Sequence, residues 1–282
     1  MKRLLTIQDI SCVGQCSTTV ALPLVSACGV ECAVLPPAIL SNHTAKGFSG
    51  WTFRDLTDEM KPIEARWVAE GVKFDAFYTG YVCESHIEPI LSIERTCANP
   101  GALRFVDPAM ADGGAMYAGF AADFPRKMAK LVEGCDYVLP NLTEAAFLTG
   151  TDAKEALRVA SSDASWNEKS AVYERLIAGL HALGAKHVIL TGVERGAREL
   201  GSAVSDGAKV EYDFNEKLDR MSHGTGDVYA SVFAGAVLRG KSPLEAAALA
   251  ADIVCAAIRA TDADHWYGVS FERTIPALAN SF

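Results

Sequence analysis

Short apolar stretches of strand length alternate with longer amphipathic stretches along almost the whole chain, and this alternation limits the fold more than any other feature. Polar residues, Gly or Pro follow most of the apolar stretches, as is common where strands end. Strands that are separated by helices pair in parallel and are covered by helices on both faces. The sequence therefore predicts an α/β fold with a mostly parallel central sheet. The predicted parallel strands are Leu4–Gln8, Cys32–Leu35, Phe74–Tyr78, Arg104–Val106, Tyr137–Leu139 and Val188–Leu190.

The segments between these strands carry apolar residues at helical spacing or turn residues. A hairpin of the strands Glu199–Ser205 and Lys209–Phe214 is expected around Asp206-Gly207, and a flexible loop over Ala109–Gly119. The segment 153–164 fits a helix or a linker. No linker or repeat interrupts the 282 residues, so we expect one domain over 1–282, with a reduced lid at about 38–51. The predicted helices are Ser17–Cys28, Asp55–Glu70, Glu84–Thr96, Phe124–Val132, Thr143–Leu148, Ala171–Leu183, a helix after Asp227, Pro243–Arg259 and Phe271–Ala279.

The charge of the chain excludes some partners. The formal net charge is −9 and no basic cluster occurs, so neither nucleic acid nor an anionic membrane surface is expected as a partner. The apolar run at the N-terminus is too short for a signal sequence, and no stretch reaches the ~18 apolar residues that span a bilayer. We therefore expect a cytoplasmic protein. The eight cysteines lack zinc-site spacing, so most are expected to be buried or free thiols.

The stretch His223-Gly224-Thr225-Gly226-Asp227 leads from a polar segment into an apolar helix pattern. Two glycines allow the backbone to turn its N–H groups toward one point, and the start of a helix attracts anions. Asp227 then has two interpretations. It is either the N-cap of the helix, which stabilises it by ~1 kcal/mol, or a base that takes a proton from an alcohol beside a bound phosphate. In either case the helix dipole is expected to lower its pKa.

These residues, with four other motifs in the right order, resemble the pyridoxal kinases of the ribokinase-like superfamily. The resemblance covers nearly the whole chain and implies a three-layer sandwich. It also implies an enzyme that phosphorylates the 5′-hydroxyl of B6 vitamers, with ATP as co-substrate, Mg²⁺, room for a monovalent cation, and a homodimer. The other motifs are Ser41-Asn42-His43-Thr44, Thr79-Gly80-Tyr81, Val106-Asp107-Pro108 and Pro140-Asn141-Leu142-Thr143-Glu144.

The resemblance also implies roles for individual residues. Asp227 is the expected base, with Gly224, Thr225 and Gly226 around the transferred phosphoryl group. Thr225, Gly226, Asn141 and Thr191 are expected to bind ATP, and its adenine is expected near residues 214–221 and the helix around Val254. Glu144 and Asp107 are the expected metal residues. The vitamin is expected to contact Asp9, Ser11, Ser41, Thr44 and Tyr81.

Structural interpretations stay open for several of these residues. Asn141 and Glu144 also fit a capping box, in which each side chain bonds the other residue's backbone N–H. Tyr81 also fits core packing, and Thr191 also fits a strand end. Asp9-Ile10 departs from the pyridoxal kinase pattern, which has a Ser-His pair after Ile-Gln. That departure is similar to a pyridoxamine kinase subgroup and leans toward hydroxymethylpyrimidine kinases.

Other functions fit the sequence less well. No Gly-x-x-x-x-Gly-Lys-Ser/Thr occurs, which excludes a P-loop enzyme, and no Gly-x-Gly-x-x-Gly follows the first strand, which disfavours a dinucleotide-binding oxidoreductase. The main alternative is hydroxymethylpyrimidine kinase, and a sugar or nucleoside kinase is more distant. A catalytically silent B6-binding protein on the same fold is the alternative from outside the enzymes, against which the intact Asp227 argues.

Overall fold

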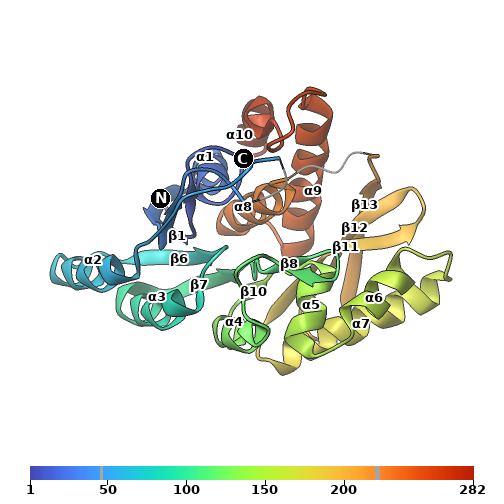
Figure 1. The fold of residues 1–282 in the computed structure, drawn as a ribbon, viewed down its shortest axis with the longest axis horizontal. Coiled ribbons are helices and arrows are strands. Elements are labelled where there is room, and N and C mark those ends of the chain that lie inside the picture. The colour runs from blue at the N-terminus through green and yellow to red at the C-terminus, as the bar shows by residue number, and fades with distance from the viewer. Residues whose placement is uncertain (45–46, 220–222) are drawn as a thin grey trace. The chain divides into compact units, whose positions relative to one another are not determined.

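The computed structural model describes residues 1–44, 47–219 and 223–282. Two compact units are distinguished in it. Unit 1 consists of residues 1–103 and 218–282, and unit 2 consists of residues 104–217. Figure 1 shows strands of a sheet with helices around them. We describe each unit by itself, and the expected single domain stays a prediction.

The sheet of unit 1 is centred on β1 (Arg3–Ile7), which pairs in parallel with β3 (Glu31–Leu35) and β6 (Phe74–Thr79). Leu4, Leu5 and Ile7 have no exposed surface. A parallel strand covered on both faces has to be apolar at successive positions, which explains the continuous apolar run at the start of the sequence. All three strands begin and end within one residue of the predicted positions.

One helix of unit 1, α9 (Pro243–Ala260), begins where the sequence supplies a cap. Ser242 accepts a hydrogen bond from the Glu245 N–H, and Pro243 occupies the first turn of this helix, where no internal donor is needed. The helix α8 (Thr225–Leu238) packs against both α1 (Thr18–Ala27) and α9. The helices of unit 1 are α1 (Thr18–Ala27), α2 (Thr57–Ala69), α3 (Glu84–Cys97), α8 (Thr225–Leu238), α9 (Pro243–Ala260), η1 (Phe271–Thr274) and α10 (Ile275–Ala279).

A second, small sheet lies in the part of unit 1 where the lid is expected. Its strands lie in the order β2 (Ile10–Ser11), β4 (Ala38–Leu40) and β5 (Phe53–Asp55). β2 and β4 are parallel, and β4 and β5 are antiparallel. Residues 45–46 of the expected lid lie outside the described residues, as do 220–221 of the segment expected near the adenine. The closing of a lid stays a prediction.

The strand β7 (Ala98–Val106) runs across the boundary of the two units, and unit 2 continues the sheet from it. The order is β7, β10 (Tyr137–Val138), β11 (His187–Gly196), β12 (Glu199–Ser205) and β13 (Val210–Glu216). The first three are parallel, and the last two are added as antiparallel strands. The sheet is thus mostly parallel with helices around it, which confirms the predicted fold class.

Several predicted segments differ from the structure. The helix that was expected to start at Ala171 begins at Trp166. β7 starts at Ala98 instead of Arg104, although Pro100-Gly101 is a pair typical of turns. β11 continues to Gly196 instead of ending at Leu190, because β12 folds back along it with register shifts near Thr191 and Glu194. The loop at 109–119 contains a hairpin of β8 (Ala111–Asp112) and β9 (Ala115–Met116). The helices of unit 2 are α4 (Phe124–Val132), α5 (Leu142–Thr149), α6 (Ala153–Ala160) and α7 (Trp166–Ala182).

No helix within the described residues combines the length and the apolar character that crossing a membrane requires.

Candidate active site

Asp227 is the third residue of α8 in unit 1. The N-cap of this helix is Gly224, in the left-handed conformation with a φ of 79°, and no side chain caps the helix. The N-cap interpretation of Asp227 is therefore wrong. A side chain at position 224 would place its Cβ atom 1.9 Å from the carbonyl oxygen of Gln15, so the close approach of this loop requires glycine.

Gln15 is held by residues near the end of the chain. Its side-chain Nε2 donates to both carboxylate oxygens of Glu272, at 2.7 and 2.8 Å, and its Oε1 accepts from His265 Nε2 at 2.8 Å. Its backbone N–H donates to the Tyr267 carbonyl at 3.3 Å. Gln15 therefore connects the C-terminal segment to the loop at the start of α8. The sequence contains no motif that reveals this connection.

The residue Asp227 as a whole is half-buried. The nearby Ser17 backbone N–H stabilises the charged form of its carboxylate. Burial, and then the negative charge of Asp9, raise the pKa of Asp227 to about 7. The expected lowering by the helix dipole is wrong, because loss of solvation and a like charge outweigh the ~0.3–1 kcal/mol that a dipole contributes. Asp227 is thus a stronger base than its position in a helix suggests.

Asp9 lies in the loop between β1 and β2, and only 3% of its surface is exposed. Ser11 Oγ donates a hydrogen bond to Asp9 Oδ2 at 2.8 Å, and the nearby Ser17 hydroxyl also stabilises the charged form of this carboxylate. Burial raises the pKa of Asp9 despite these two donors. Asp9, Ser11 and Asp227 therefore lie in one region of unit 1, together with Ser17, for which no sequence motif indicates a function.

Tyr81 is half-buried just beyond the end of β6, and its hydroxyl is hydrogen-bonded to Cys83. Burial and neighbouring negative charge raise the pKa of Tyr81 above its usual value of 10. Cys83 caps α3 together with His86: the Cys83 N–H donates to His86 Nδ1 at 2.9 Å. His86 Nε2 in turn lies 3.4 Å from Asp55 Oδ1 on β5. The ring of Tyr81 is therefore fixed through Cys83.

Ser41 and Thr44, which the resemblance assigns to the vitamin, are both exposed. Ser41 Oγ donates to Asn42 Oδ1 at 2.8 Å and accepts from the Thr52 N–H at 2.9 Å, so it stabilises the turn between β4 and β5. His43 between them is buried, and its Nε2 lies 3.1 Å from the Tyr267 carbonyl oxygen. Their contact with a ligand stays a prediction.

Asn141 and Glu144 of unit 2 form a capping box at the start of α5. Asn141 Oδ1 accepts from the Glu144 N–H at 3.0 Å, and Glu144 Oε2 accepts from the Asn141 N–H at 2.9 Å. Glu144 also accepts from the N–H groups of Met110, at 3.2 Å, and Ala111. Burial raises the pKa of Glu144 to about 8, against the lowering effect of these donors. The structural interpretation of the pair is correct, and any role in binding metal is additional to it.

The other two residues assigned to the nucleotide and metal also lie in unit 2. Asp107 follows β7 directly and is buried. Thr191 lies within β11 instead of ending a strand, and its Oγ1 donates to the Pro140 carbonyl at 3.2 Å. Among the described residues, no group of three or more His, Cys, Asp and Glu side chains is arranged to hold a metal ion.

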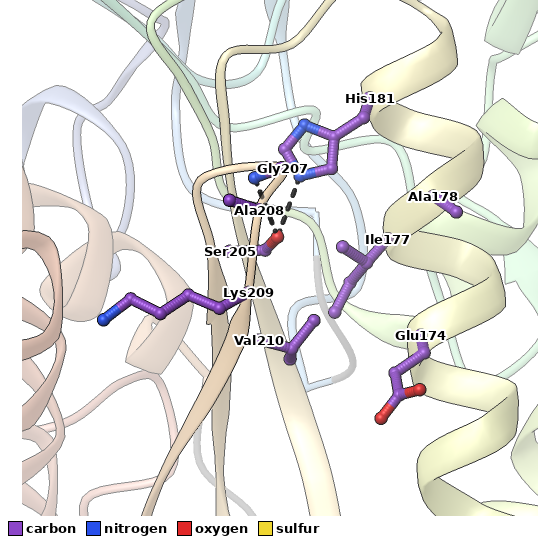
Figure 2. A pocket seen from close by; sticks show the side chains of 9 residues that line it. All are labelled: Glu174, Ile177, Ala178, His181, Ser205, Gly207, Ala208, Lys209 and Val210. Atoms are coloured by element: carbon purple, nitrogen blue, oxygen red, sulfur yellow. Dashed lines mark hydrogen bonds between the residues drawn. The ribbon is translucent and has the colours of Figure 1, made fainter.

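Unit 2 contains a pocket of about 310 Å³ between α7 and the β12–β13 hairpin, and none of the predicted site residues lines it. Figure 2 shows His181 and Gly207 hydrogen-bonded to Ser205 in its wall. His181 Nδ1 donates to the Ala185 carbonyl at 2.9 Å, so Nε2 accepts from Ser205 Oγ at 2.9 Å. These polar groups satisfy one another and hold the hairpin against the helix.

A protein family and several known proteins are similar to this chain over most of its length. A family model described as phosphomethylpyrimidine kinase matches residues 26–269. The pyridoxal kinase PdxY of Aliivibrio fischeri is 26% identical over 259 residues, which cover 87% of this chain and 84% of that protein.

Two proteins of solved structure are each 30% identical in sequence to this chain. A protein from Bacteroides thetaiotaomicron described as a phosphomethylpyrimidine kinase, in a crystal form with pyridoxal, superposes with a TM-score of 0.88 over 98% of this chain and 95% of its own. The pyridoxal kinase of Lactobacillus plantarum superposes with a TM-score of 0.87 over 100% of this chain and 98% of its own. With the family model matching most of its length and the fold shared nearly end to end, the chain belongs to the phosphomethylpyrimidine kinase family.

Proposed function

We propose that the chain is an ATP- and Mg²⁺-dependent kinase that phosphorylates the 5′-hydroxyl of pyridoxal, pyridoxamine and pyridoxine in vitamin B6 salvage. The observation that carries the proposal is the carboxylate of Asp227 in the first turn of α8, which does not cap the helix and whose pKa is raised to about 7. A base is most effective when its pKa lies near the working pH. The pyridoxal kinases among its relatives support the choice of substrate.

Asp227 takes the proton of the substrate hydroxyl as that oxygen attacks the γ-phosphorus of ATP. Phosphoryl transfer requires mainly positioning and stabilisation of charge on the transferred group. The N–H groups of Thr225 and Gly226 begin α8, where they favour an anion, and Gly224 gives the loop its turn. The nearby Ser17 N–H stabilises the charged form of the Asp227 carboxylate.

Asp9, Ser11 and Tyr81 bind the vitamin in this proposal, with Ser41 and Thr44 as outer contacts. Asp9 and Tyr81 influence each other electrostatically, since the charge of Asp9 contributes to the raised pKa of Tyr81. The ring of Tyr81 offers an aromatic face to a pyridine. Because Cys83 holds the Tyr81 hydroxyl, binding requires little further ordering of this side chain.

Asn141, Thr191, Glu144 and Asp107 of unit 2 serve ATP and its metal in this proposal. Mg²⁺ supplies neutralisation of phosphate charge and usually keeps several of its waters. Glu144 is buried and its oxygens accept from the N–H groups of Asn141, Met110 and Ala111, so a water-mediated role fits it better than direct coordination. The monovalent cation and the homodimer stay predictions from the family resemblance.

A second candidate, phosphorylation of a hydroxymethylpyrimidine, is favoured by the description of the matching family model. Both substrates are primary alcohols on a nitrogen heterocycle, so the proposed base and anion site serve either. The difference between them has to come from the residues that surround the ring.

The proposal is tested by measuring ADP release at saturating MgATP with the three B6 vitamers, hydroxymethylpyrimidine, ribose and no acceptor. We expect the highest kcat/KM values for the vitamers. A higher value for hydroxymethylpyrimidine assigns the second candidate instead. Tight binding of a vitamer by calorimetry without turnover of any acceptor identifies a silent binding protein.

A further inference from the structure

Gln15 lies in the loop between β2 and α1, between two glycines that come from distant parts of unit 1. A Cβ atom at Gly224 would lie 1.9 Å from the Gln15 carbonyl oxygen. A Cβ atom at Gly268 would lie 2.6 Å from the Gln15 Cβ atom. Gln15 is therefore in close contact with the start of α8 through its backbone and with the segment 265–272 through its side chain.

The side chain of Gln15 is bonded at both of its polar atoms. Its Nε2 donates to the two carboxylate oxygens of Glu272, at 2.7 and 2.8 Å, and its Oε1 accepts from His265 Nε2 at 2.8 Å. A carboxylate only accepts, so the amide has to turn its NH2 group toward Glu272 and its oxygen toward His265. Gln15, His265 and Glu272 thus form a clamp in which the amide has one orientation.

The backbone of the loop is bonded to the same segment. The Tyr267 carbonyl oxygen accepts from the Gln15 N–H at 3.3 Å and lies 3.1 Å from His43 Nε2. The His43 N–H in turn donates to the Val13 carbonyl at 3.0 Å. Hydrogen bonds on both sides of Gly14 therefore hold the loop, and the clamp determines where the Gln15 carbonyl lies.

The Gln15 carbonyl limits the position of the backbone that begins α8. The helical hydrogen bonds start at the Val228 N–H, which donates to the Gly224 carbonyl at 3.0 Å. The N–H groups of Thr225 and Gly226 precede it, at the end of the helix that favours an anion. Because the Gln15 carbonyl packs against Gly224, a shift of Gln15 moves these N–H groups relative to a phosphoryl group.

We propose that Gln15 is a positioning residue for phosphoryl transfer, which holds the N–H groups at the start of α8 in place and is itself held by His265 and Glu272. This inference rests on the proposed function. Phosphoryl transfer depends on the placement of groups around the transferred phosphoryl, and a displacement near 1 Å can cost ~10²-fold in rate. Gln15 acts through Gly224 and not on the reacting atoms.

A reciprocal exchange of Gln15 and Glu272 tests the clamp. In Gln15→Glu two carboxylates face each other and repel. We expect kcat for pyridoxal at saturating MgATP to fall at least about tenfold, because the N–H groups at the start of α8 are displaced. The KM for pyridoxal should change less than about twofold, since the lost interaction is one made with the transferred phosphoryl group.

The double variant Gln15→Glu/Glu272→Gln has the net charge of the wild type. Its new amide donates to its new carboxylate, which also accepts from His265, so the clamp forms again with donor and acceptor exchanged. We expect kcat to return to within about threefold of the wild type, the mark of two residues that act as a pair.

Two further variants separate the clamp from other effects of substitution. Gln15→Met keeps the length of the side chain but lacks a comparable donor or acceptor, so kcat should fall without any new charge. Asp262→Asn removes an exposed carboxylate that pairs with Arg273 at 2.6 Å, three residues before His265, and it changes the net charge as Glu272→Gln does. Its kcat should match the wild type even where its thermal unfolding midpoint is lower.

A wild-type kcat in either Gln15 variant overturns the inference, and so does a double variant no faster than Gln15→Glu. A loss in Asp262→Asn equal to that in Gln15→Glu overturns it as well, because kcat then follows the stability of the C-terminal segment. Should Gln15→Glu not fold, the kcat of Gln15→Met decides. In all these cases the wild type still phosphorylates pyridoxal and the proposed function stands. If the wild type phosphorylates no vitamer, the proposed function has failed and the inference fails with it.

Discussion

Asp227 and Glu144 are both the third residue of a helix, yet their surroundings differ completely. Glu144 follows the N-cap Asn141 and closes a capping box, and its carboxylate accepts from the N–H groups of Asn141, Met110 and Ala111. Asp227 follows the N-cap Gly224, which has no side chain, and takes no part in capping its helix. The pKa of each is raised, mainly by burial. The comparison teaches that the N-cap residue decides whether an acid in the first turn serves the helix or remains available for chemistry.

The largest expected effect is that of Asp227→Asn on the rate. Asn has the same size but cannot take the hydroxyl proton, and removing a general base costs ~10²–10⁴-fold in rate. We expect kcat to fall at least about a hundredfold, with the KM for ATP nearly unchanged because the N–H groups of the loop remain. The thermal unfolding midpoint is measured beside the kinetics. A variant that unfolds earlier but turns over normally shows that Asp227 is structural, like Glu144.

The next effect concerns two left-handed glycines, Gly224 at the start of α8 and Gly150 at the end of α5, with φ values of 79° and 69°. At Gly224 a Cβ atom meets the Gln15 carbonyl, whereas at Gly150 nothing lies within 4 Å. Gly150→Ala should therefore cost only about 1–2 kcal/mol of stability. Gly224→Ala also has to move the loop, and a displacement near 1 Å can cost ~10²-fold in rate.

Stability by denaturant unfolding and kcat are measured for both glycine variants. A Gly224→Ala enzyme with the activity of Gly150→Ala contradicts the proposed role of the loop.

The smallest expected effect is that of Glu144→Gln. The amide loses part of the capping box and leaves a buried N–H without an acceptor, which costs ~1–3 kcal/mol of unfolding free energy. If Glu144 also orders the waters of Mg²⁺, the Mg²⁺ concentration for half-maximal rate rises, while kcat at saturating Mg²⁺ falls far less than in Asp227→Asn.

Glu245→Gln is the matched control for Glu144, because Glu245 closes the capping box of α9 with Ser242 and is exposed. It should lose less stability and keep its Mg²⁺ requirement. An unchanged Mg²⁺ requirement in both variants leaves Glu144 with the capping role alone.

The sequence predicts most elements of the fold because local patterns determine them. The helix at Phe124–Val132 and the strand at Glu199–Ser205 have the expected ends, since Pro125 lies in the first turn of that helix and the Asp206-Gly207 turn follows that strand. β7 and β11 were predicted too short, because pairing with neighbours extends them through residues with weak strand character. Such pairing depends on contacts distant in sequence.

The candidate site was predictable where a motif is local and less so elsewhere. Gly224 to Asp227 and the pair Asn141 and Glu144 are noticeable from their spacing, although the family resemblance alone assigns them roles in catalysis and metal binding. The raised pKa of Asp227 was not, because it depends on Asp9 and on burial by distant segments. The positive φ of Ser17 could not be predicted from the sequence, because serine does not favour this backbone conformation.

The surroundings of Cys16 also determine how the chain reacts with electrophiles. Thiolates are the reactive form of cysteine, and burial together with the charges of Asp227 and Asp9 raises the pKa of Cys16 well above its usual value. Cys28 and Cys32 are suppressed in the same way, with pKa values of about 12. Cys12 is exposed, close to Cys16 in the chain. A maleimide dye should therefore label Cys12 first, which places a fluorescent reporter in the loop between β2 and α1.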